Sequence, residues 1–191
     1  MDSHKHFILH KPFGYLSQFV NNQNKRKNKW LLGELYPFPK GVMPIGRLDQ
    51  NSEGLLLLTT DGQLSHYINS SGIEKEYYAL VDGLITENTI EKLSYGVTIT
   101  SNSKAYRTKP CKVKLIKQLS HIPLADRSVR DPRHGPTSWI SLTLTEGKFR
   151  QVRKMTAAVG FPTLRLIRVR IGATQLNLDS GKVKQVEQFQ L

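Results

Sequence analysis

The chain has 191 residues, 38% of them hydrophobic, which is enough for one domain with a buried core. Its 28 Lys and Arg residues against 15 Asp and Glu residues give a net charge of +13, which favours a polyanionic partner such as a nucleic acid. The single cysteine, Cys111, excludes an internal disulfide and a multi-cysteine zinc site. No apolar run is long enough for a membrane span or a signal peptide, so we expect a cytoplasmic protein.

Hydrophobic periodicity and turn residues predict the secondary structure. In chain order we expect a strand at 6–10, a loop to about residue 45, a buried strand at 55–58, a short helix around 64–68, a strand at 76–81 and a helix at 87–95. The second half is expected to contain strands at 97–100 and 112–117, an Arg- and Pro-rich loop at 120–137, a strand at 140–145, a helix at 149–159 and a strand at 165–171. This pattern favours an α+β domain whose mixed, largely antiparallel sheet is flanked by short helices.

Positive charge is concentrated in the C-terminal half. Eight of the eleven arginines lie between Arg127 and Arg170, where ten basic residues and two acidic residues give a net charge of +8. The planar guanidinium group can donate two hydrogen bonds to one phosphate, so this cluster favours nucleic acid over a membrane. A second basic run, at residues 25–29, is either a solvated loop or a further phosphate contact.

The chain lacks several common catalytic motifs. It has no phosphate-binding loop, no dinucleotide-binding glycine motif and no nucleophile elbow, and its histidines show no metal-binding helical spacing, so we expect no metal site. The segment Gly46–Asp49 instead places an arginine and an aspartate in a loop just before a buried strand. A strand end is rigid enough to hold a catalytic side chain, although an aspartate there is more often a turn former or an arginine partner.

Four blocks of the sequence resemble the small ribosomal RNA pseudouridine synthases. They are K-P-F-G-Y-L-S-Q-F at 11–19, G-R-L-D-Q-N-S-E-G-L-L-L-L-T-T-D-G at 46–62, E-K-E-Y-Y-A-L-V-D-G at 74–83 and E-G-K-F-R-Q-V-R-K-M-T-A-A-V-G-F-P-T-L-R-L-I-R at 146–168. The blocks come in the family's order and span nearly the whole chain. The resemblance implies the pseudouridine synthase fold, as one catalytic domain over residues 1–191. It also implies two lobes around a central RNA-binding cleft, without the S4-like domain of many relatives.

The resemblance also implies roles for four residues. Asp49 would be the catalytic aspartate, and Arg153 would pair with it. Tyr77 would stack on the target uracil, and Leu166 would line the base pocket. The reaction breaks the N1–C1′ bond of a uridine and rejoins the ring through C5, which needs one carboxylate and no metal, nucleotide or redox cofactor. A hydrolytic glycosidase would ordinarily need a pair of carboxylates. Without the resemblance, Tyr77 fits a core strand and Arg153 fits a phosphate contact.

Basic residues in or beside these blocks are candidate RNA contacts, since contacts to the backbone position an RNA without specifying its sequence. They are Lys11, Arg47, Lys75, Lys148, Arg150, Lys154, Arg165 and Arg168. The segment P-T-S-W at 136–139 and the start of the similarity at K-P resemble the branch that modifies 23S ribosomal RNA. That branch implies structured 23S RNA near the peptidyl transferase centre as the partner, and a monomeric enzyme that binds no membrane.

The sequence departs from the family pattern at three positions. Phe149 stands where the family usually has Asn, Ser52 where Thr is common, and Thr60 where Asn is common. None of these belongs to the implied catalytic set, and we expect no hydrogen bond to be carried over to Phe149. Two other functions remain open: a non-catalytic rRNA-binding or ribosome-assembly protein with the same fold, and a synthase that acts on another RNA.

Overall fold

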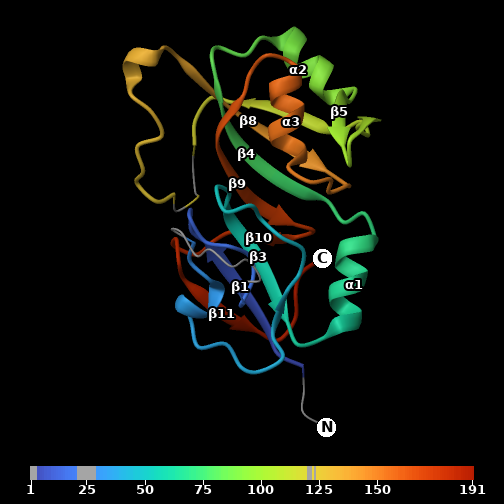
Figure 1. The fold of residues 1–191 in the computed structure, drawn as a ribbon, viewed down its shortest axis with the longest axis vertical. Helices are drawn as coiled ribbons and strands as arrows, with labels where there is room; N and C mark the ends of the chain where they lie inside the picture. The colour runs from blue at the N-terminus through green and yellow to red at the C-terminus, as the bar shows by residue number, and fades with distance from the viewer. Residues whose placement is uncertain (1–3, 21–28, 120–121, 123) are drawn as a thin grey trace. The chain divides into compact units, whose positions relative to one another are not determined.

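The structure, a computed structural model, describes residues 4–20, 29–119, 122 and 124–191. The predicted basic run at 25–29 therefore lies outside the described residues, apart from Lys29. The chain folds into two compact units (Figure 1). Unit 1 comprises Met1–Ile73, Ile122–Ala125 and Arg168–Leu191, and unit 2 comprises Glu74–His121 and Asp126–Ile167. The chain passes from unit 2 to unit 1 within strand β9 (Thr163–Ile171).

Unit 1 is built from short antiparallel strands. Its centre is β1 (His6–Lys11), which pairs with β3 (Glu53–Thr59) and with β11 (Val183–Val186). The two-residue strands β2 (Met43–Pro44) and β10 (Thr174–Gln175) pair with β3 and with the end of β9. A short 3-10 helix, η1 (Leu32–Glu34), and the helix α1 (Gly62–Ser70) complete the unit.

Burial explains why the leucine run of unit 1 forms a strand. All four leucines at 55–58 are 0% exposed, so β3 is covered on both faces and needs no polar alternation. Its partners on one face are apolar side chains from β1, η1 and the loop before β2, namely Phe7, Leu9, Leu32 and Val42. The helix α1 begins where the Asp61 carboxylate accepts hydrogen bonds from the backbone N–H groups of Gln63 and Leu64, at 2.9 and 3.0 Å.

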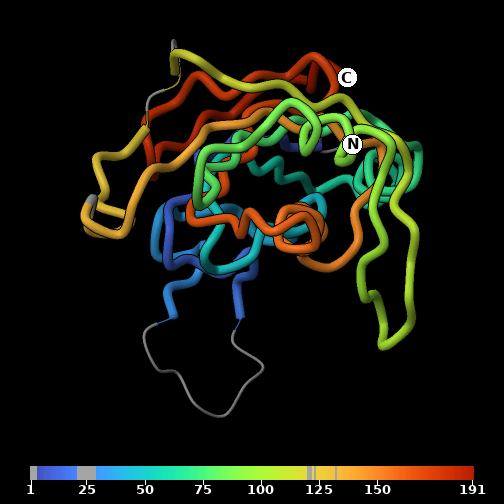
Figure 2. Tube along the Cα trace, turned by 90° about the horizontal axis from the view of Figure 1, so that it is seen from above, coloured from blue at the N-terminus to red at the C-terminus, as the bar shows by residue number. Residues whose placement is uncertain are grey.

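Unit 2 is built from antiparallel strands with helices on one face. The strand β8 (Thr137–Leu144) pairs with β4 (Lys75–Asp82) and with β7 (Lys112–Ile116). The helices α2 (Glu87–Ser94) and α3 (Gln151–Ala158) lie on the same side of these strands in Figure 1. Their buried side chains, which include Leu93, Val152 and Met155, share one core with β4 and β8. The hairpin of β5 (Thr98–Ser101) and β6 (Lys104–Arg107) extends away from that sheet (Figure 2).

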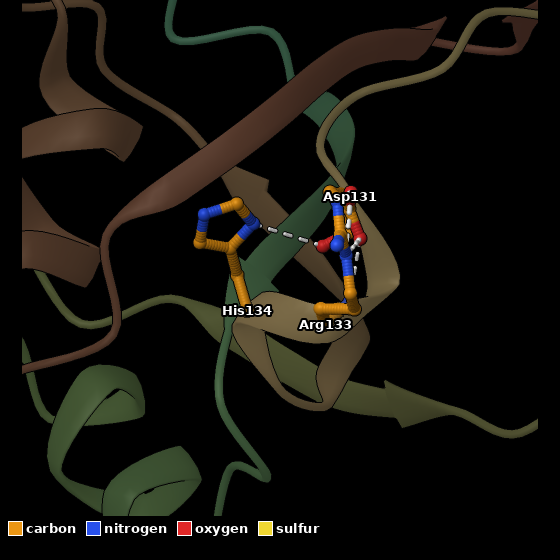
Figure 3. Close-up of polar contacts among 3 residues, drawn as sticks. All are labelled: Asp131, Arg133 and His134. Carbon is orange, nitrogen blue, oxygen red and sulfur yellow. Dashed lines mark hydrogen bonds and ion pairs between the residues drawn. The ribbon is translucent and has the colours of Figure 1, made fainter.

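The predicted loop at 120–137 uses several of its charges within the fold. Arg130 forms an ion pair with Asp82 at the end of β4, with 2.8 Å between Nη1 and Oδ2. In the short 3-10 helix η2 (Pro132–His134), the Arg133 side chain reaches the Asp131 carboxylate at 2.6 Å, and the His134 ring contacts the Asp131 carbonyl (Figure 3). The Arg133 guanidinium holds the pKa of Asp131 below its usual value. Arg130 and Arg133 therefore have structural partners inside unit 2.

The observed strands and helices confirm the predicted α+β class, with largely antiparallel strands and short flanking helices. The helix predicted at 149–159 begins only at Gln151, because Arg150 takes a left-handed conformation with φ of +53°. The pairing of β5 with β6 and of β1 with β11 was not predicted, because β6 and β11 have only four residues each and their patterns are weak. Among the described residues, none of the helices is long and apolar enough to cross a membrane.

Candidate active site

The loop that carries Asp49 joins β2 to β3 in unit 1. It turns at Gly46, whose φ is +66°, and it buries Leu48 while Asp49 stays partly exposed. The Asp49 carbonyl accepts a hydrogen bond from the Ser52 backbone N–H at 3.0 Å. This turn fixes Asp49 a few residues before the fully buried strand β3, which is the rigid position that the sequence predicted.

A second segment of unit 1 holds this loop in place. The Ser17 hydroxyl donates to the Leu48 carbonyl and accepts from the Leu48 N–H, both at 2.9 Å. The Gly14 N–H donates to the Gln50 carbonyl at 2.9 Å. The blocks at 11–19 and 46–62, which are separate in the sequence, thus meet on both sides of Asp49.

Lys11 connects these two segments from inside the unit. Its side chain is 0% exposed, and its Nζ donates to the carbonyls of Pro12 and Tyr15 at 2.9 and 2.7 Å. Burial lowers the pKa of Lys11 from 10.5 to about 7; Glu53 and Asp49 oppose this shift, and Arg168 adds to it. Lys11 therefore lies in the electrostatic field of Asp49. Its burial argues against the predicted contact with an RNA phosphate.

Arg168, another predicted RNA contact, is also buried. It is 3% exposed, and its Nε donates to the Leu55 carbonyl of β3 at 2.8 Å. The two backbones approach closely: a Cβ atom at Gly54, whose φ is +108°, would lie 2.3 Å from the Arg168 carbonyl oxygen. Only glycine fits this contact. In this conformation the Arg168 side chain packs on β3 and is not available on the surface.

In unit 2, the predicted site residues lie on the elements expected for them. Tyr77 is on the same face of β4 as the buried Ala79 and is partly buried against the unit 2 core. Leu166 is 5% exposed and belongs to that core. Arg153 lies partly buried on α3, where its Nη1 donates to the Thr163 carbonyl at 3.1 Å. Since Asp49 belongs to unit 1, its predicted pairing with Arg153 stays a prediction.

The turn before α3 is fixed by Glu146. Its carboxylate accepts hydrogen bonds from Tyr106 Oη at 2.5 Å, from the Lys109 N–H at 3.0 Å and from Gln151 Nε2 at 2.6 Å. Burial acts to raise the pKa of Glu146, but these hydrogen bonds outweigh it and the pKa is lowered. Gln151 Oε1 in turn accepts from the Lys148 N–H at 2.9 Å. The start of α3, and with it Arg153, is therefore held to β6.

The other predicted RNA contacts differ in exposure. Arg47 and Lys148 are exposed, whereas Lys75, Arg150 and Lys154 are partly buried, and Arg165 is only 6% exposed. The sequence interpretation assigned no role to Ser17, Glu53, Glu146 or Gln151. Glu53 offered a signal, because a carboxylate directly before a buried leucine run must find partners inside the protein. Over the described ranges, His, Cys, Asp and Glu residues form no group of three or more that could hold a metal ion.

Comparison with known proteins identifies the family of this chain. Residues 5–158 match the RNA pseudouridylate synthase family, and the chain belongs to that family. It is 39% identical over 172 residues to the ribosomal large subunit pseudouridine synthase E of Xanthomonas axonopodis pv. citri, covering 89% of this chain and 87% of that protein. The protein of the same name from Vibrio parahaemolyticus is 38% identical, covering 98% and 76%.

A solved structure agrees with this classification. The crystal structure of a pseudouridylate synthase superposes with a TM-score of 0.75 at 26% identity, and the match covers 97% of this chain and 71% of that chain. The predicted pseudouridine synthase fold is thereby confirmed. The chain is accordingly an isomerase of the RNA pseudouridylate synthase type.

Proposed function

We propose that this protein isomerises one uridine of large-subunit (23S) ribosomal RNA to pseudouridine, with Asp49 as the catalytic carboxylate. The observation that carries the proposal is the doubly anchored Asp49 loop, in a chain of the RNA pseudouridylate synthase family. This chain covers 87% and 76% of two relatives that are named ribosomal large subunit pseudouridine synthase E, which supports the choice of RNA.

The chemistry assigns one task to each site residue. The N1–C1′ bond of the uridine breaks, the base turns, and C5 forms the new bond to C1′. C5 then loses its proton and N1 gains one, so atoms and charge balance without a cofactor. Asp49 assists bond cleavage, Arg153 orients it, Tyr77 stacks on the uracil and Leu166 lines the base pocket.

The target base must leave its stack before it can react, which costs a few kcal/mol. Stacking on Tyr77 recovers about 1–3 kcal/mol of this cost. The exposed cations Arg47 and Lys148, and the partly buried Lys75, Arg150 and Lys154, are the better placed phosphate contacts. We further propose that the two units flank the RNA as lobes, that the target uridine lies near the peptidyl transferase centre, and that the enzyme acts as a cytoplasmic monomer.

The decisive experiment measures tritium release from in vitro transcribed 23S rRNA labelled at uridine C5. The unmodified protein should release about one equivalent per RNA, because the label leaves when C5 becomes the point of attachment. Asp49→Asn should release none and still bind the RNA with nearly unchanged affinity, because only the carboxylate charge is lost.

Other results would select the alternatives. Release from 16S or transfer RNA alone would indicate a synthase with a different substrate. Tight binding without release from any of these RNAs, or from precursor particles, would favour a non-catalytic ribosome-assembly protein. Full activity of Asp49→Asn would rule out the proposed mechanism.

A further inference from the structure

The turn that precedes α3 displays an aromatic side chain to solvent. Phe149 is 66% exposed, although burial of a phenylalanine ordinarily stabilises a protein by about 1.5–3 kcal/mol. Tyr106 and Glu146, described above, tie this turn to β6, and none of the proposed catalytic steps uses Phe149. A large apolar ring at such a place has no evident role in the stability of unit 2.

The backbone around Phe149 is held on both sides. Lys148 before it donates its N–H to Gln151 Oε1 at 2.9 Å and accepts from the Gln151 N–H at 3.1 Å. Arg150 after it has the left-handed φ of +53°, and its carbonyl accepts from the Lys154 N–H at 3.0 Å. The ring therefore projects from a fixed turn, so little conformational freedom is lost when a ligand stacks on it.

Lys154 lies over the Phe149 ring, and Lys148 precedes Phe149 in the same turn, so the turn carries positive charge. Lys154 Nζ lies 5.2 Å from the Phe149 ring centroid and donates to the Thr100 carbonyl at 2.7 Å, which fixes the ammonium group there. Lys148 Nζ lies 4.7 Å from the ring centroid of Tyr106, which Glu146 anchors. Each ammonium is thus held at an aromatic face by a cation–π contact.

An exposed aromatic ring on a basic turn suits an unpaired nucleotide. Every base has a π face that can stack on a phenyl ring, and lysines attract the phosphates on either side of it. A protein partner with an apolar patch fits less well, because it would have to bury both ammonium groups.

We propose that Phe149, with Lys148 and Lys154, forms a stacking platform for an unpaired base of the RNA substrate other than the target uridine. This inference rests on the proposed function for the identity of the RNA. The platform adds affinity and helps to place the RNA, and it takes no part in the bond-breaking step.

The test compares variants of the full chain for binding to in vitro transcribed 23S rRNA. Phe149→Ala and Phe149→Leu should each raise the Kd about tenfold, and Phe149→Trp should keep it within about twofold, because leucine retains apolar bulk but no π face. Tyr95→Ala is the matched control: it removes an equally exposed ring (66%) of unit 2 and should leave the Kd within about twofold. The salt dependence of Kd should stay unchanged in Phe149→Ala and decrease in Lys154→Met.

Two outcomes would overturn the platform: Phe149→Ala binding as tightly as the unmodified protein, or Phe149→Leu doing so, which would indicate plain apolar contact. Tritium release measured in the same samples separates this result from the proposed function. If the unmodified protein releases tritium and Phe149→Ala binds the RNA normally, only the stacking platform is ruled out. If Phe149→Ala binds more weakly but the unmodified protein releases no tritium, the stacking site is supported and the proposed reaction is ruled out.

Discussion

At the scale of single residues, the candidate site depends on Lys11, which supports the Asp49 loop from inside unit 1 and needs no contact with the RNA. Lys11 is fully buried, and its Nζ binds two carbonyls of the segment that holds the Asp49 loop. The charged groups that act on it are Glu53, Asp49 and Arg168. Burying an ammonium is unfavourable unless it has partners, so this side chain couples protonation to the folding of unit 1.

The first prediction concerns the pH dependence of Lys11→Met. The folded-state pKa of about 7 lies below the ordinary 10.5, so between these values the unfolded chain binds a proton that the folded protein does not. This group therefore makes stability rise with pH from about 7 to 10.5, and it contributes no slope below pH 7. Lys11→Met should flatten the curve by up to about 1.4 kcal/mol per pH unit. Urea unfolding at pH 7–10 measures this slope.

The control for that measurement is Lys92→Met, which removes an exposed lysine of α2 and should leave the slope unchanged. Parallel curves for Lys11→Met and the unmodified protein would mean that Lys11 titrates normally.

Gly54 gives the second prediction. Gly54→Ala would place a Cβ 2.3 Å from the Arg168 carbonyl oxygen, whereas Gly41→Ala, also at a positive φ (+86°), would meet nothing within 4 Å. Gly41→Ala should therefore cost about 1 kcal/mol from backbone strain alone. Gly54→Ala should cost about 3 kcal/mol or more, because β9 must also shift away from β3. Thermal unfolding of both variants makes the comparison, and equal losses would show that the close approach is absent.

At the scale of elements, the turn at 146–150 explains where α3 begins. The predicted start at residue 149 followed from hydrophobic spacing, which cannot register that Arg150 adopts a left-handed conformation. The hydrogen bonds of Glu146 and Gln151 stabilise that conformation, and they connect the turn both to β6 and to α3. One carboxylate thus sets the position of both Phe149 and Arg153.

The third prediction tests the Glu146 carboxylate by removing one of its hydrogen-bond donors. Tyr106→Phe removes one hydrogen bond to an ionised group and should lower the free energy of unfolding by clearly more than the control below. Tyr95→Phe, which removes the hydroxyl of an exposed tyrosine, should change it by less than about 0.5 kcal/mol. Adding Glu146→Gln to Tyr106→Phe should cost less than Glu146→Gln alone, and strict additivity in urea unfolding would contradict the coupling.

Sequence patterns predicted the strands that carry long apolar patterns and missed several of the shortest strands. The strand β8 and the leucines of β3 follow from alternation and from an apolar run, whereas β11 has only four residues, too few for a clear pattern. Likewise, the position of Lys11 at a strand end did not indicate its burial, because its partners come from the fold of unit 1. The family blocks supplied Asp49 and Arg153, but Glu146 and Ser17 emerged only from their hydrogen bonds.

At the scale of the whole molecule, unit 1 is assembled from segments far apart in the sequence. Its strand β1 pairs on one edge with β3 and on the other with β11, and the buried Phe189 ring lies 5.3 Å from that of His6. Unit 2 is interposed between these segments along the chain and has its own core. A truncation within unit 1 should therefore destabilise unit 1 more than unit 2.

The fourth prediction removes residues 183–191. Loss of β11 exposes one edge of β1 and opens the core around Phe7, so backbone amides of β1 and β3 should lose protection against hydrogen exchange by about tenfold or more. Amides of β8 and α2 serve as the internal control and should keep their protection. Equal loss in both units, measured by mass spectrometry, would mean that they unfold together.

The split of unit 1 also affects the protein while it is being synthesised. As the chain leaves the ribosome, β1 and β3 emerge early and can pair, but Arg168 and β11 follow only after all of unit 2 has been translated. During that interval the nascent chain presents an unpaired strand edge, which is a site for aggregation or for chaperones. Lys11 lacks its Arg168 neighbour until translation has passed β9, so before that point the nascent chain cannot carry all the charged groups that act on Lys11.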